Sequence, residues 1–397
     1  MIDDYKLVLD TFCEVHDLLK PWADAEFWDF QTHINSKNFI PGAVYLIGRR
    51  EFTDNVAHIK QLVEDDVIKV IFSNPAEGAD TMYWQCRMLG IYELVKQGKI
   101  LIITGGYLPP SMPHLYYENF LPKILDYNEN LAAIDQYKTN SSSTRPYKFL
   151  FLNGRMRTHR KYLLERFKAS GLLDKSLWTN LDPRTTSGFR YLEWYDHGDE
   201  NSPQHYPDQE FAYDPFPVRR LPPEYEVDRY RSQSIVAPPN SNNDLQVKHH
   251  LFNNEWGDIY LESKPYLDTY FSLVTETTFD YQYTFRTEKI WKPVAMGHPW
   301  IVVANAGYYK DMHNAGFKTF GHVIDESFDS IENPLDRCAR IGQVVEDLCQ
   351  QNLASFLEEC YTVCKYNQQH LAEMRIKVRQ EFPIRFEQYI NDYLPIR

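Results

Sequence analysis

The stretch YFSLVTETTFDYQYTFRTEKIWKPVAMGHPWIVVAN, residues 270–305, decides the fold predicted for this chain of 397 residues. Residues 271–275 and 300–304 are short runs rich in apolar and β-branched side chains, which favour buried strands. The segment between them has helical apolar spacing and ends in Gly297 followed by His and Pro, as helices commonly do. A strand, a helix and a second strand in this order predict a parallel sheet.

Polar residues stand where such units bind ligands. Glu276 directly follows the first strand, and Thr287, Glu288 and Lys289 begin the helix. Ligands of open parallel sheets bind at the carboxyl ends of strands, and helix amino ends attract phosphates. This corner therefore predicts a nucleotide diphosphate site.

Length and composition set the broad class. A chain of 397 residues is long for a single core, so two domains are predicted. The net charge of -13 argues against broad, nonspecific binding to nucleic acid, although a local basic groove remains possible. Nothing at the amino terminus resembles a signal peptide, and no apolar run approaches the roughly 20 residues that cross a bilayer, so a cytoplasmic location is expected.

Strands and helices alternate through the first third of the chain, after a helical or irregular lead-in over residues 1–40. This alternation predicts a Rossmann-like acceptor domain over residues 1–140, and the polar segment QYKTNSSSTRP at 136–146 reads as a linker. The expected strands are 43–48, 67–73 and 99–106, and the expected helices are 55–64, 81–97 and 116–134.

The segment KFLFLNGRMRTHRKYLLERFK, residues 148–168, predicts a strand, an Asn-Gly turn and a helix that starts near Thr158. Arg155, Arg157 and Arg160 cluster at the start of that helix, where the helix dipole disfavours cations unless an anion is bound. This position favours phosphate or diphosphate binding by arginine. A solvated basic helix face is the alternative.

The remaining sequence predicts a donor domain over residues 147–365 with an irregular insertion at 178–245, rich in Pro, Asp, Asn and Tyr. The insertion is predicted to be either a substrate-specific platform for the acceptor or a layer of loops packed against the sheet. Arg219 and Arg220 lie in it and are candidate acceptor contacts, with solvated loop charge as the alternative. Helices at 366–397 are expected to cross back toward the first domain.

Two further groups of residues have ordinary explanations. Asp325, Glu326 and Asp329 are expected to cap the helix that starts near Pro334, with sugar binding as the alternative. The six cysteines lack paired metal spacing and are expected to be core thiols rather than a zinc site.

The phrases FSLVTET, FRTEKIWKPVAMGHPWIVV and GFKTF together resemble nucleotide-sugar glycosyltransferases of the two-Rossmann GT-B type, especially the fucosyltransferase-like and exostosin-like groups. Their donor domain carries F-x-L-x-x-E-N followed by T-E-K, and here Thr277 replaces the Asn. Residues 148–168 also look like uncharacterised glycosyltransferases of phage and bacterial genomes. The resemblance covers about residues 148–330. The matching residues are Phe271, Leu273, Glu276, Thr287, Glu288 and Lys289.

The resemblance implies an α/β fold with two Rossmann-like, doubly wound domains facing a cleft and a C-terminal helical tail. It implies that Glu288 holds ribose or sugar hydroxyls, and that Lys289 and an upstream arginine such as Arg155 hold the diphosphate. It also implies that Glu276 holds the sugar of a nucleotide sugar such as a UDP-sugar. The change at Thr277 puts fucose in doubt as the donor. No D-x-D pair is present to chelate a metal between phosphates, so a metal-independent enzyme without a cofactor is expected.

These features predict a glycosyltransferase that moves a sugar to an acceptor hydroxyl of a surface glycan or of a hydroxymethylated base in phage DNA, in the host cytoplasm if the protein is phage-encoded. Displacement needs a general base, for which Glu77, Asp80 and His114 are candidates in loops after strands of the first domain. A noncatalytic sugar- or nucleotide-binding module is the alternative. A Rossmann oxidoreductase lacks support because no strand is followed by G-x-G-x-x-G.

Overall fold

The computed structural model divides into two compact units, whose described parts fall within residues 1–122 and 375–397 for the first unit, and within 123–236 and 248–374 for the second. The structure describes residues 6–27, 33, 39–40, 42–76, 79–126, 144–154, 156–181, 184–186, 211–213, 216, 219, 221–225, 261, 263–277, 279–281 and 283–394.

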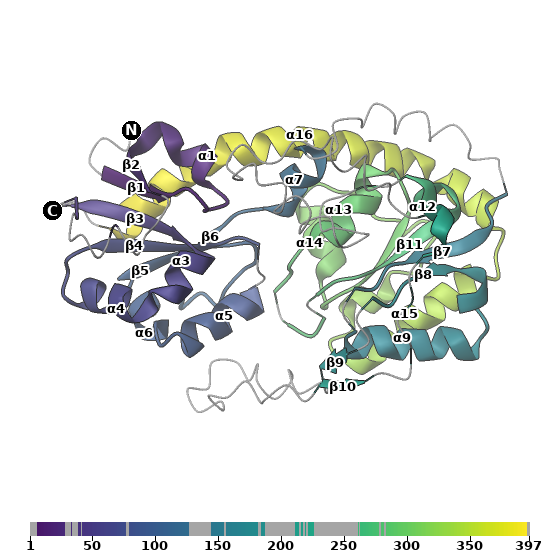
Figure 1. The fold of residues 1–397 in the computed structure, drawn as a ribbon. Coiled ribbons are helices and arrows are strands. Elements are labelled where there is room, and N and C mark those ends of the chain that lie inside the picture. The colour runs from purple at the N-terminus through teal and green to yellow at the C-terminus, as the bar shows by residue number, and fades with distance from the viewer. Residues whose placement is uncertain are drawn as a thin grey trace. The chain divides into compact units, whose positions relative to one another are not determined.

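The first unit is built on a sheet of six parallel strands in the order β2-β1-β3-β4-β5-β6 (Figure 1). Its strands are β1 (Lys6–Asp10), β2 (Ala23–Phe27), β3 (Ala43–Gly48), β4 (Lys69–Asn74), β5 (Ile100–Thr104) and β6 (Leu115–Tyr116). The helices along this part of the chain are α1 (His16–Leu19), η1 (Lys20–Trp22), α3 (Arg49–Asp54), α4 (Val56–Glu64), α5 (Ala79–Met88), α6 (Tyr92–Lys96) and α7 (Phe120–Asp126).

The start of this unit differs from the expected helical or irregular lead-in. Residues 6–10 form a strand that pairs with both β2 and β3, and Leu7, Val8 and Leu9 are all fully buried. A strand covered on both faces shows a continuous apolar run rather than alternation, and a run of three is too short to be told from a helix segment. The predicted helix at 116 is likewise preceded by a short strand, β6.

The connection order of the first sheet creates a switch point between β1 and β3. The chain leaves β1 to form β2 on one side, and it then returns to form β3 on the other side. The Asp10 carboxylate joins the two strand ends by accepting the N–H groups of Phe12 and Gly48, each at 2.9 Å. A Cβ on Gly48 would stand 3.0 Å from Asp10 Oδ2, which explains the glycine.

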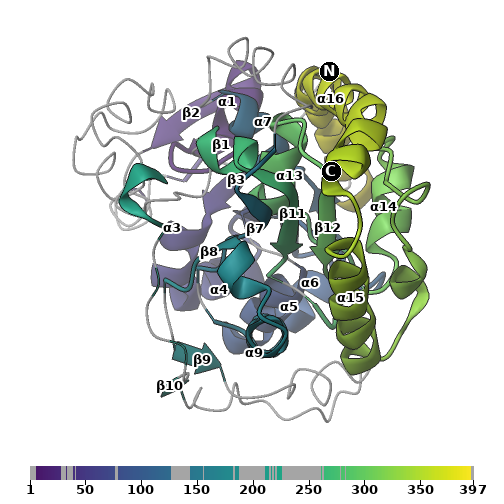
Figure 2. The same cartoon turned by 90° about the vertical axis from the view of Figure 1, so that its right-hand side faces the viewer.

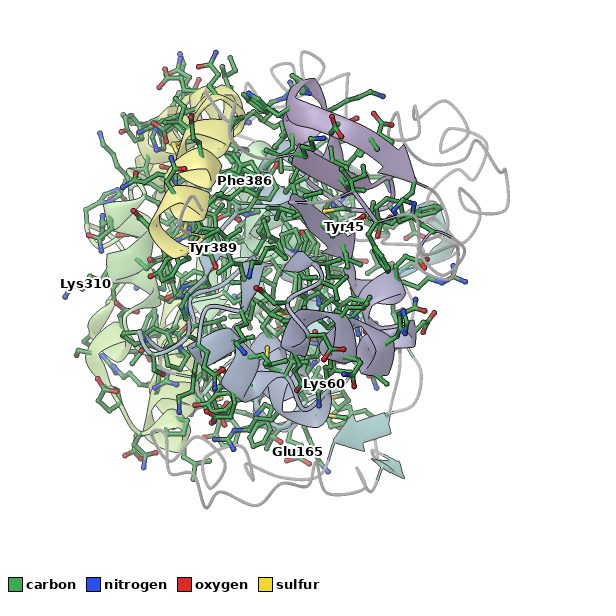
Figure 3. All side chains as sticks on the ribbon, turned by 90° about the vertical axis from the view of Figure 1, so that its left-hand side faces the viewer. Tyr45, Lys60, Glu165, Lys310, Phe386 and Tyr389 are labelled. Atoms are coloured by element: carbon green, nitrogen blue, oxygen red, sulfur yellow. The ribbon has the colours of Figure 1, made fainter. Side chains whose placement is uncertain are left out.

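The core of the first unit includes the end of the C-terminal helix α16 (Leu353–Tyr393). Phe382, Phe386, Tyr389 and Ile390 belong to one buried cluster with side chains of the sheet, such as Val44, Ile71 and Leu101. Figure 3 shows Phe386 and Tyr389 on this end of the helix. The Tyr389 hydroxyl accepts the N–H of Ile102 at 3.1 Å, so the helix is fixed to the sheet by a polar contact as well.

The second unit contains a sheet of four parallel strands in the order β12-β11-β7-β8 (Figure 2). Its strands are β7 (Tyr147–Phe151), β8 (Leu177–Trp178), β11 (Thr269–Thr275) and β12 (Trp300–Val303). Its helices are α9 (Thr158–Ala169), η2 (Leu173–Lys175), η3 (Pro223–Tyr225), α12 (Lys264–Leu267), α13 (Glu288–Ala295), α14 (Tyr308–Asn314), η5 (Ser327–Ser330), α15 (Pro334–Leu348) and the first part of α16. A separate antiparallel pair joins β9 (Arg184–Thr186) to β10 (Phe211–Tyr213).

Side-chain alternation along β7 shows which helices cover each face of this sheet. Phe149 packs 5.5 Å from Phe167 of α9 between ring centroids, whereas Leu150 belongs to the cluster that contains Tyr266 of α12 and Met296 after α13. Helices therefore cover both faces, as in a doubly wound sheet. The chain leaves β7 toward β8 and later returns to β11 on the other side, so the switch point of the second sheet lies between β7 and β11.

These observations confirm the predicted α/β class with two parallel sheets, and β11, α13 and β12 confirm the predicted strand, helix and strand. A cleft between the domains stays a prediction. The predicted linker is described only at residues 144–146, and the insertion at 178–245 only in part. Within the residues described, no helix combines the length and the apolar character needed to cross a bilayer. All six cysteines are buried and free, as expected for core thiols.

The acidic group before α15 differs from its predicted role. Asn333, and not an acidic residue, caps α15 by accepting the N–H groups of Leu335 and Asp336. Asp329 does cap a helix, but it is α14, since its carboxylate accepts the N–H groups of Tyr309 and Lys310. Asp329 therefore caps a helix, as predicted, but that helix is α14 and not the predicted α15.

Candidate functional site

The main cavity of the second unit has a volume of about 540 Å³ and lies at the carboxyl ends of β7 and β11. This is the switch point of the sheet, where open parallel sheets bind ligands. The cavity continues over the sheet beneath α13, because Leu150 of β7 and Ser272 and Val274 of β11 line it together with side chains of α13. Its walls are formed by Leu150, Leu152, Asn153, Gly154, Arg157, Arg160, Thr179, Leu181, Tyr266, Ser272, Leu273, Val274, Thr275, Thr277, Glu288, Lys289, Lys292 and Pro293.

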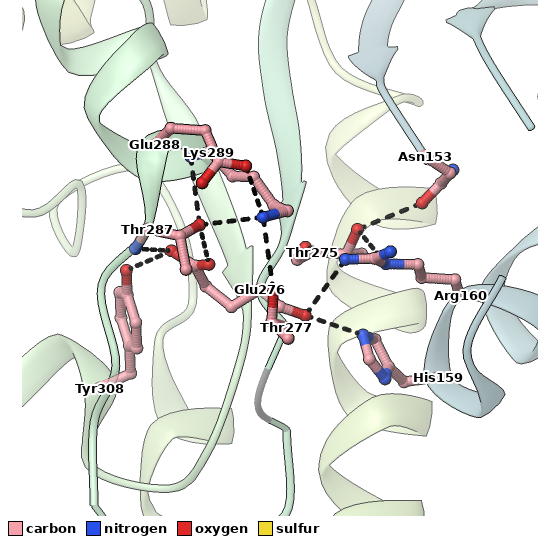
Figure 4. A network of polar contacts seen from close by, with 10 residues as sticks. All are labelled: Asn153, His159, Arg160, Thr275, Glu276, Thr277, Thr287, Glu288, Lys289 and Tyr308. Atoms are coloured by element: carbon pink, nitrogen blue, oxygen red, sulfur yellow. Dashed lines mark hydrogen bonds and ion pairs between the residues drawn. The ribbon is translucent and has the colours of Figure 1, made fainter. Parts of the chain in front are cut away.

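The amino end of α13 is held by a clamp between Thr287 and Glu276 (Figure 4). The Thr287 N–H donates to Glu276 Oε1 at 3.1 Å, and the Thr287 hydroxyl donates to Oε2 at 2.6 Å. The same hydroxyl accepts the Lys289 N–H at 3.2 Å, so Thr287 is also the N-cap of the helix. The clamp fixes where α13 begins relative to the end of β11.

Glu276 acts behind the cavity wall rather than on it. Its side chain is fully buried, and Tyr308 supplies a further donor to Oε1 at 3.1 Å. Burial raises the pKa of Glu276, opposed by nearby Lys289 and by the Thr287 hydrogen bonds. The carboxylate is thus occupied in positioning α13, and the expected contact between Glu276 and a donor sugar stays an untested prediction that this geometry does not favour.

Glu288 and Lys289 lie together at the cavity wall. Lys289 Nζ is 2.6 Å from Glu288 Oε1 and 3.1 Å from the Thr287 hydroxyl. Burial works against the charged form of Glu288, but the positive charges of Lys289 and Lys292 outweigh it and lower the pKa of Glu288. The site therefore presents an ionised carboxylate flanked by two cations, which suits hydroxyl groups on one side and phosphate on the other.

The first turn of α9 brings His159 and Arg160 to the end of β11. Arg160 donates from Nε to the Thr275 hydroxyl at 3.1 Å and from Nη2 to the Thr275 carbonyl at 2.9 Å. His159 Nε2 donates to the Glu276 carbonyl at 3.2 Å, and burial together with Arg160 and Arg157 holds its pKa well below the usual range. Arg160 thus lines the cavity while it also braces the strand end.

Of the other predicted arginines, the structure describes Arg157 and Arg219. Arg157 lines the cavity and occupies the N-cap position of α9, without a side-chain hydrogen bond to the first turn. Arg155 and Arg220 lie outside the described residues. Arg219 is exposed, exchanges two backbone hydrogen bonds of 2.8 Å with Asn180, and places its guanidinium carbon 4.4 Å from the Trp178 ring centroid.

Of the three predicted general bases of the first unit, the structure describes only the side chain of His114. Both ring nitrogens of His114 are engaged, because Nε2 accepts the Leu108 N–H at 3.2 Å and Nδ1 faces the Met112 carbonyl at 2.8 Å. Burial lowers the pKa of His114, so it remains a neutral brace for its loop. Glu77 lies outside the described residues, as does the side chain of Asp80.

Several cavity residues were not singled out from the sequence. Asn153 was read as a turn residue, and Lys292 falls one helical turn after Glu288 on α13, a spacing that could have indicated it. Thr179 and Tyr266 come from segments distant in sequence. No local pattern marks them, because only the tertiary fold brings them to the cavity.

A second cavity, of about 420 Å³, lies in the first unit at the switch point between β1 and β3. Asp10, Phe12, Arg49 and Arg50 are among its lining residues. Burial raises the pKa of Asp10, against the two backbone N–H groups that it accepts. The sequence did not reveal this cavity because β1 was not predicted. Within the part of the chain that the structure describes, no cluster of three His, Cys, Asp or Glu residues could hold a metal ion.

No family model and no curated protein matches the chain. Among solved structures, a UDP-forming alpha,alpha-trehalose-phosphate synthase from Burkholderia xenovorans is similar at 12% identity and a TM-score of 0.38, covering 96% of this chain and 82% of that chain. The N-terminal domain of a Candida albicans trehalose-6-phosphate phosphatase is similar at 10% identity and a TM-score of 0.33, with coverages of 88% and 72%. Both scores lie below 0.5, so neither likeness assigns a function to this chain.

Proposed function

We propose that the protein is a glycosyltransferase that binds a nucleotide diphosphate sugar, such as a UDP-sugar, in the cavity of the second unit and transfers the sugar to an acceptor hydroxyl. The observation that carries the proposal is the cavity at the switch point of the second sheet, where Arg157, Lys289 and Lys292 meet the ionised Glu288. Cations beside a carboxylate provide for a diphosphate and for sugar or ribose hydroxyls in one place.

In the proposed reaction the acceptor oxygen forms a bond to the anomeric carbon while the bond from that carbon to the β-phosphate oxygen breaks. The nucleoside diphosphate leaves with additional negative charge. Fixed cations and the amino ends of α9 and α13 stabilise that charge without requiring a metal. Lys289 is suited to this role because the Thr287 clamp and Glu288 fix its ammonium group before the donor binds.

The acceptor proton passes to a general base, which we propose to lie in the first domain, over residues 1–140. Glu77, Asp80 and His114 remain the candidates. The proposed acceptors are a surface glycan or a hydroxymethylated base in phage DNA, which Arg219 and Arg220 would contact.

Nucleoside diphosphate binding tests the donor half of the proposal. Titration calorimetry with UDP, GDP, ADP, CDP and dTDP should identify at least one ligand, and Lys289→Met should weaken it by about tenfold or more, because a charge-assisted hydrogen bond contributes roughly 1.5–3 kcal/mol. Lys310→Met is the matched control, since Lys310 is exposed on α14 and does not line the cavity. Absence of binding by the unmodified protein would overturn the proposal.

Turnover distinguishes the enzyme from a noncatalytic nucleotide-binding module. Incubation with a panel of nucleotide sugars and acceptors, including glycans and hydroxymethylated duplex DNA, should add the mass of one sugar to one acceptor, as measured by mass spectrometry. Tight nucleotide binding with neither transfer nor donor hydrolysis across the panel would favour the module instead.

A further inference from the structure

Asn153 occupies the turn between β7 and α9 at the wall of the main cavity, and its side chain is fully buried. Its backbone is fixed on both sides by Thr179. The Asn153 N–H donates to the Thr179 hydroxyl at 2.8 Å, and that hydroxyl donates to the Asn153 carbonyl at 3.0 Å. The residue is therefore held in one place regardless of what its side chain does.

A chain of hydrogen bonds determines which way the Asn153 amide points. Arg160 can only donate, so the Thr275 hydroxyl must accept from Nε at 3.1 Å. The hydroxyl proton of Thr275 is then available for Asn153 Oδ1, which lies 3.1 Å away. Oxygen thus faces Thr275, and the amide nitrogen lies on the opposite side of the group, as Figure 4 shows.

Nδ2 of Asn153 is buried and has no hydrogen-bond partner among the described atoms. Buried amide groups without partners are rare because they lose their hydrogen bonds to water, so an acceptor atom is expected at this point when the site is filled. The nitrogen can only donate, which excludes a ligand group that is itself only a donor.

The surroundings of Asn153 indicate the chemistry of that acceptor. The 12-residue helix α9 starts five residues later, and no side chain caps its first turn. Arg157 stands at the N-cap position and lines the same cavity. A helix amino end, an arginine and a free amide donor together favour an anionic oxygen over a neutral carbonyl.

Resting on the proposed function, we infer that Asn153 Nδ2 donates to a non-bridging phosphate oxygen of the nucleoside diphosphate bound at the amino end of α9. Asn153 is then a donor-positioning residue that selects for phosphorylated ligands. The apolar wall that includes Leu150, Leu181 and Tyr266 is left for the nucleobase.

Asn153→Asp tests the inference, because it keeps the shape and the oxygen that faces Thr275 but replaces the donor by a carboxylate oxygen. The affinity for the best nucleoside diphosphate should fall about a hundredfold, through loss of a charge-assisted hydrogen bond and new repulsion. The affinity for the corresponding nucleoside, measured by the same titration, should change by less than about threefold, and the monophosphate should lie between.

The control is Asn333→Asp, which makes the same chemical change at the exposed N-cap of α15, where aspartate caps equally well. If Asn153→Asp fails to fold, Thr275→Val is used in its place, because it frees the amide of Asn153 to rotate. This variant should lower the affinity for the diphosphate about tenfold and leave the affinity for the nucleoside unchanged. An equal loss of affinity for the nucleoside and the diphosphate would show that Asn153 contacts the nucleobase, and it would overturn the inference. So would unchanged diphosphate affinity, whereas a failure of the unmodified protein to bind any diphosphate would overturn the proposed function itself.

Discussion

At the scale of single residues, His298 shows how a buried side chain links stability to pH. Its Nε2 donates to the Thr269 carbonyl at 2.8 Å, so its Nδ1 is left to accept from the Ser272 hydroxyl at 2.9 Å. The neutral ring with its proton on Nε2 satisfies both contacts. Burial, reinforced by the positive charge of Arg145, lowers the pKa of His298 to about 3.

This neutral histidine predicts a loss of stability in acid. Below the ordinary histidine pKa of about 6.5 the unfolded chain binds a proton at this position that the folded chain does not bind until about pH 3. Stability therefore falls as the pH falls through this interval, by up to about 1.4 kcal/mol per pH unit for one proton. Urea unfolding between pH 4 and 7 should show a shallower pH dependence for His298→Gln, which keeps a donor for Thr269. An unchanged slope would contradict the assignment.

The residues predicted for the site separate into those with a local signal and those without one. Thr287, Glu288 and Lys289 were predicted because a strand end and a helix start bracket them, and the structure brings Glu288 and Lys289 to the cavity. Asn153 had no such signal, since Asn-Gly reads as a turn whether or not its amide faces a ligand. Glu276 was predicted as part of the same corner, but whether its side chain reaches the cavity depends on how the chain turns after β11 ends at Thr275.

At the scale of secondary-structure elements, the start of α13 connects stability to ligand binding. Thr287→Val should lower the free energy of unfolding by about 1–2 kcal/mol, because it removes the N-cap and a hydrogen bond to buried Glu276. It should also weaken nucleoside diphosphate binding, since Lys289 loses a contact that fixes its ammonium group.

Thr287→Ser is the matched control, because serine restores the hydroxyl and caps helices well. Denaturant unfolding and calorimetry on both variants separate the two effects. Equal behaviour of the serine and valine variants would show that the hydroxyl is not what holds α13 in place.

Element prediction succeeded where an apolar run was long and clearly bounded. The strand predicted at 43–48 matches β3, and the helix predicted to start near Thr158 is α9, which begins at that residue. The strand β1 was missed because Leu7, Val8 and Leu9 are bounded by charged residues and continue into apolar spacing typical of a helix. What identifies β1 is its pairing with β2 and β3, which is a tertiary fact.

At the scale of the whole molecule, α16 contributes to the cores of both units. Phe356 near its start contacts Phe271 of the second sheet, with ring centroids 6.1 Å apart, while Phe386 near its end is buried in the first unit. The sequence predicted a helical tail that returns to the first domain. It did not predict which helix face each unit covers, because the apolar pattern of a 41-residue helix does not show which residues pack against which sheet.

This division predicts that the two units can be destabilised separately. Phe386→Asp buries an unpaired charge against the sheet of the first unit and should lower the stability of that unit by several kcal/mol. Ile384→Asp makes the same kind of change two residues away at a side chain that is 68% exposed and should have almost no effect.

Hydrogen exchange measured by mass spectrometry should show faster exchange in β3, β4 and β5 for Phe386→Asp only. Nucleoside diphosphate affinity should stay unchanged, because every residue that lines the 540 Å³ cavity belongs to the second unit. Loss of binding in Phe386→Asp, with the exchange of β7 and β11 unaltered, would show that the first unit contributes to the donor site.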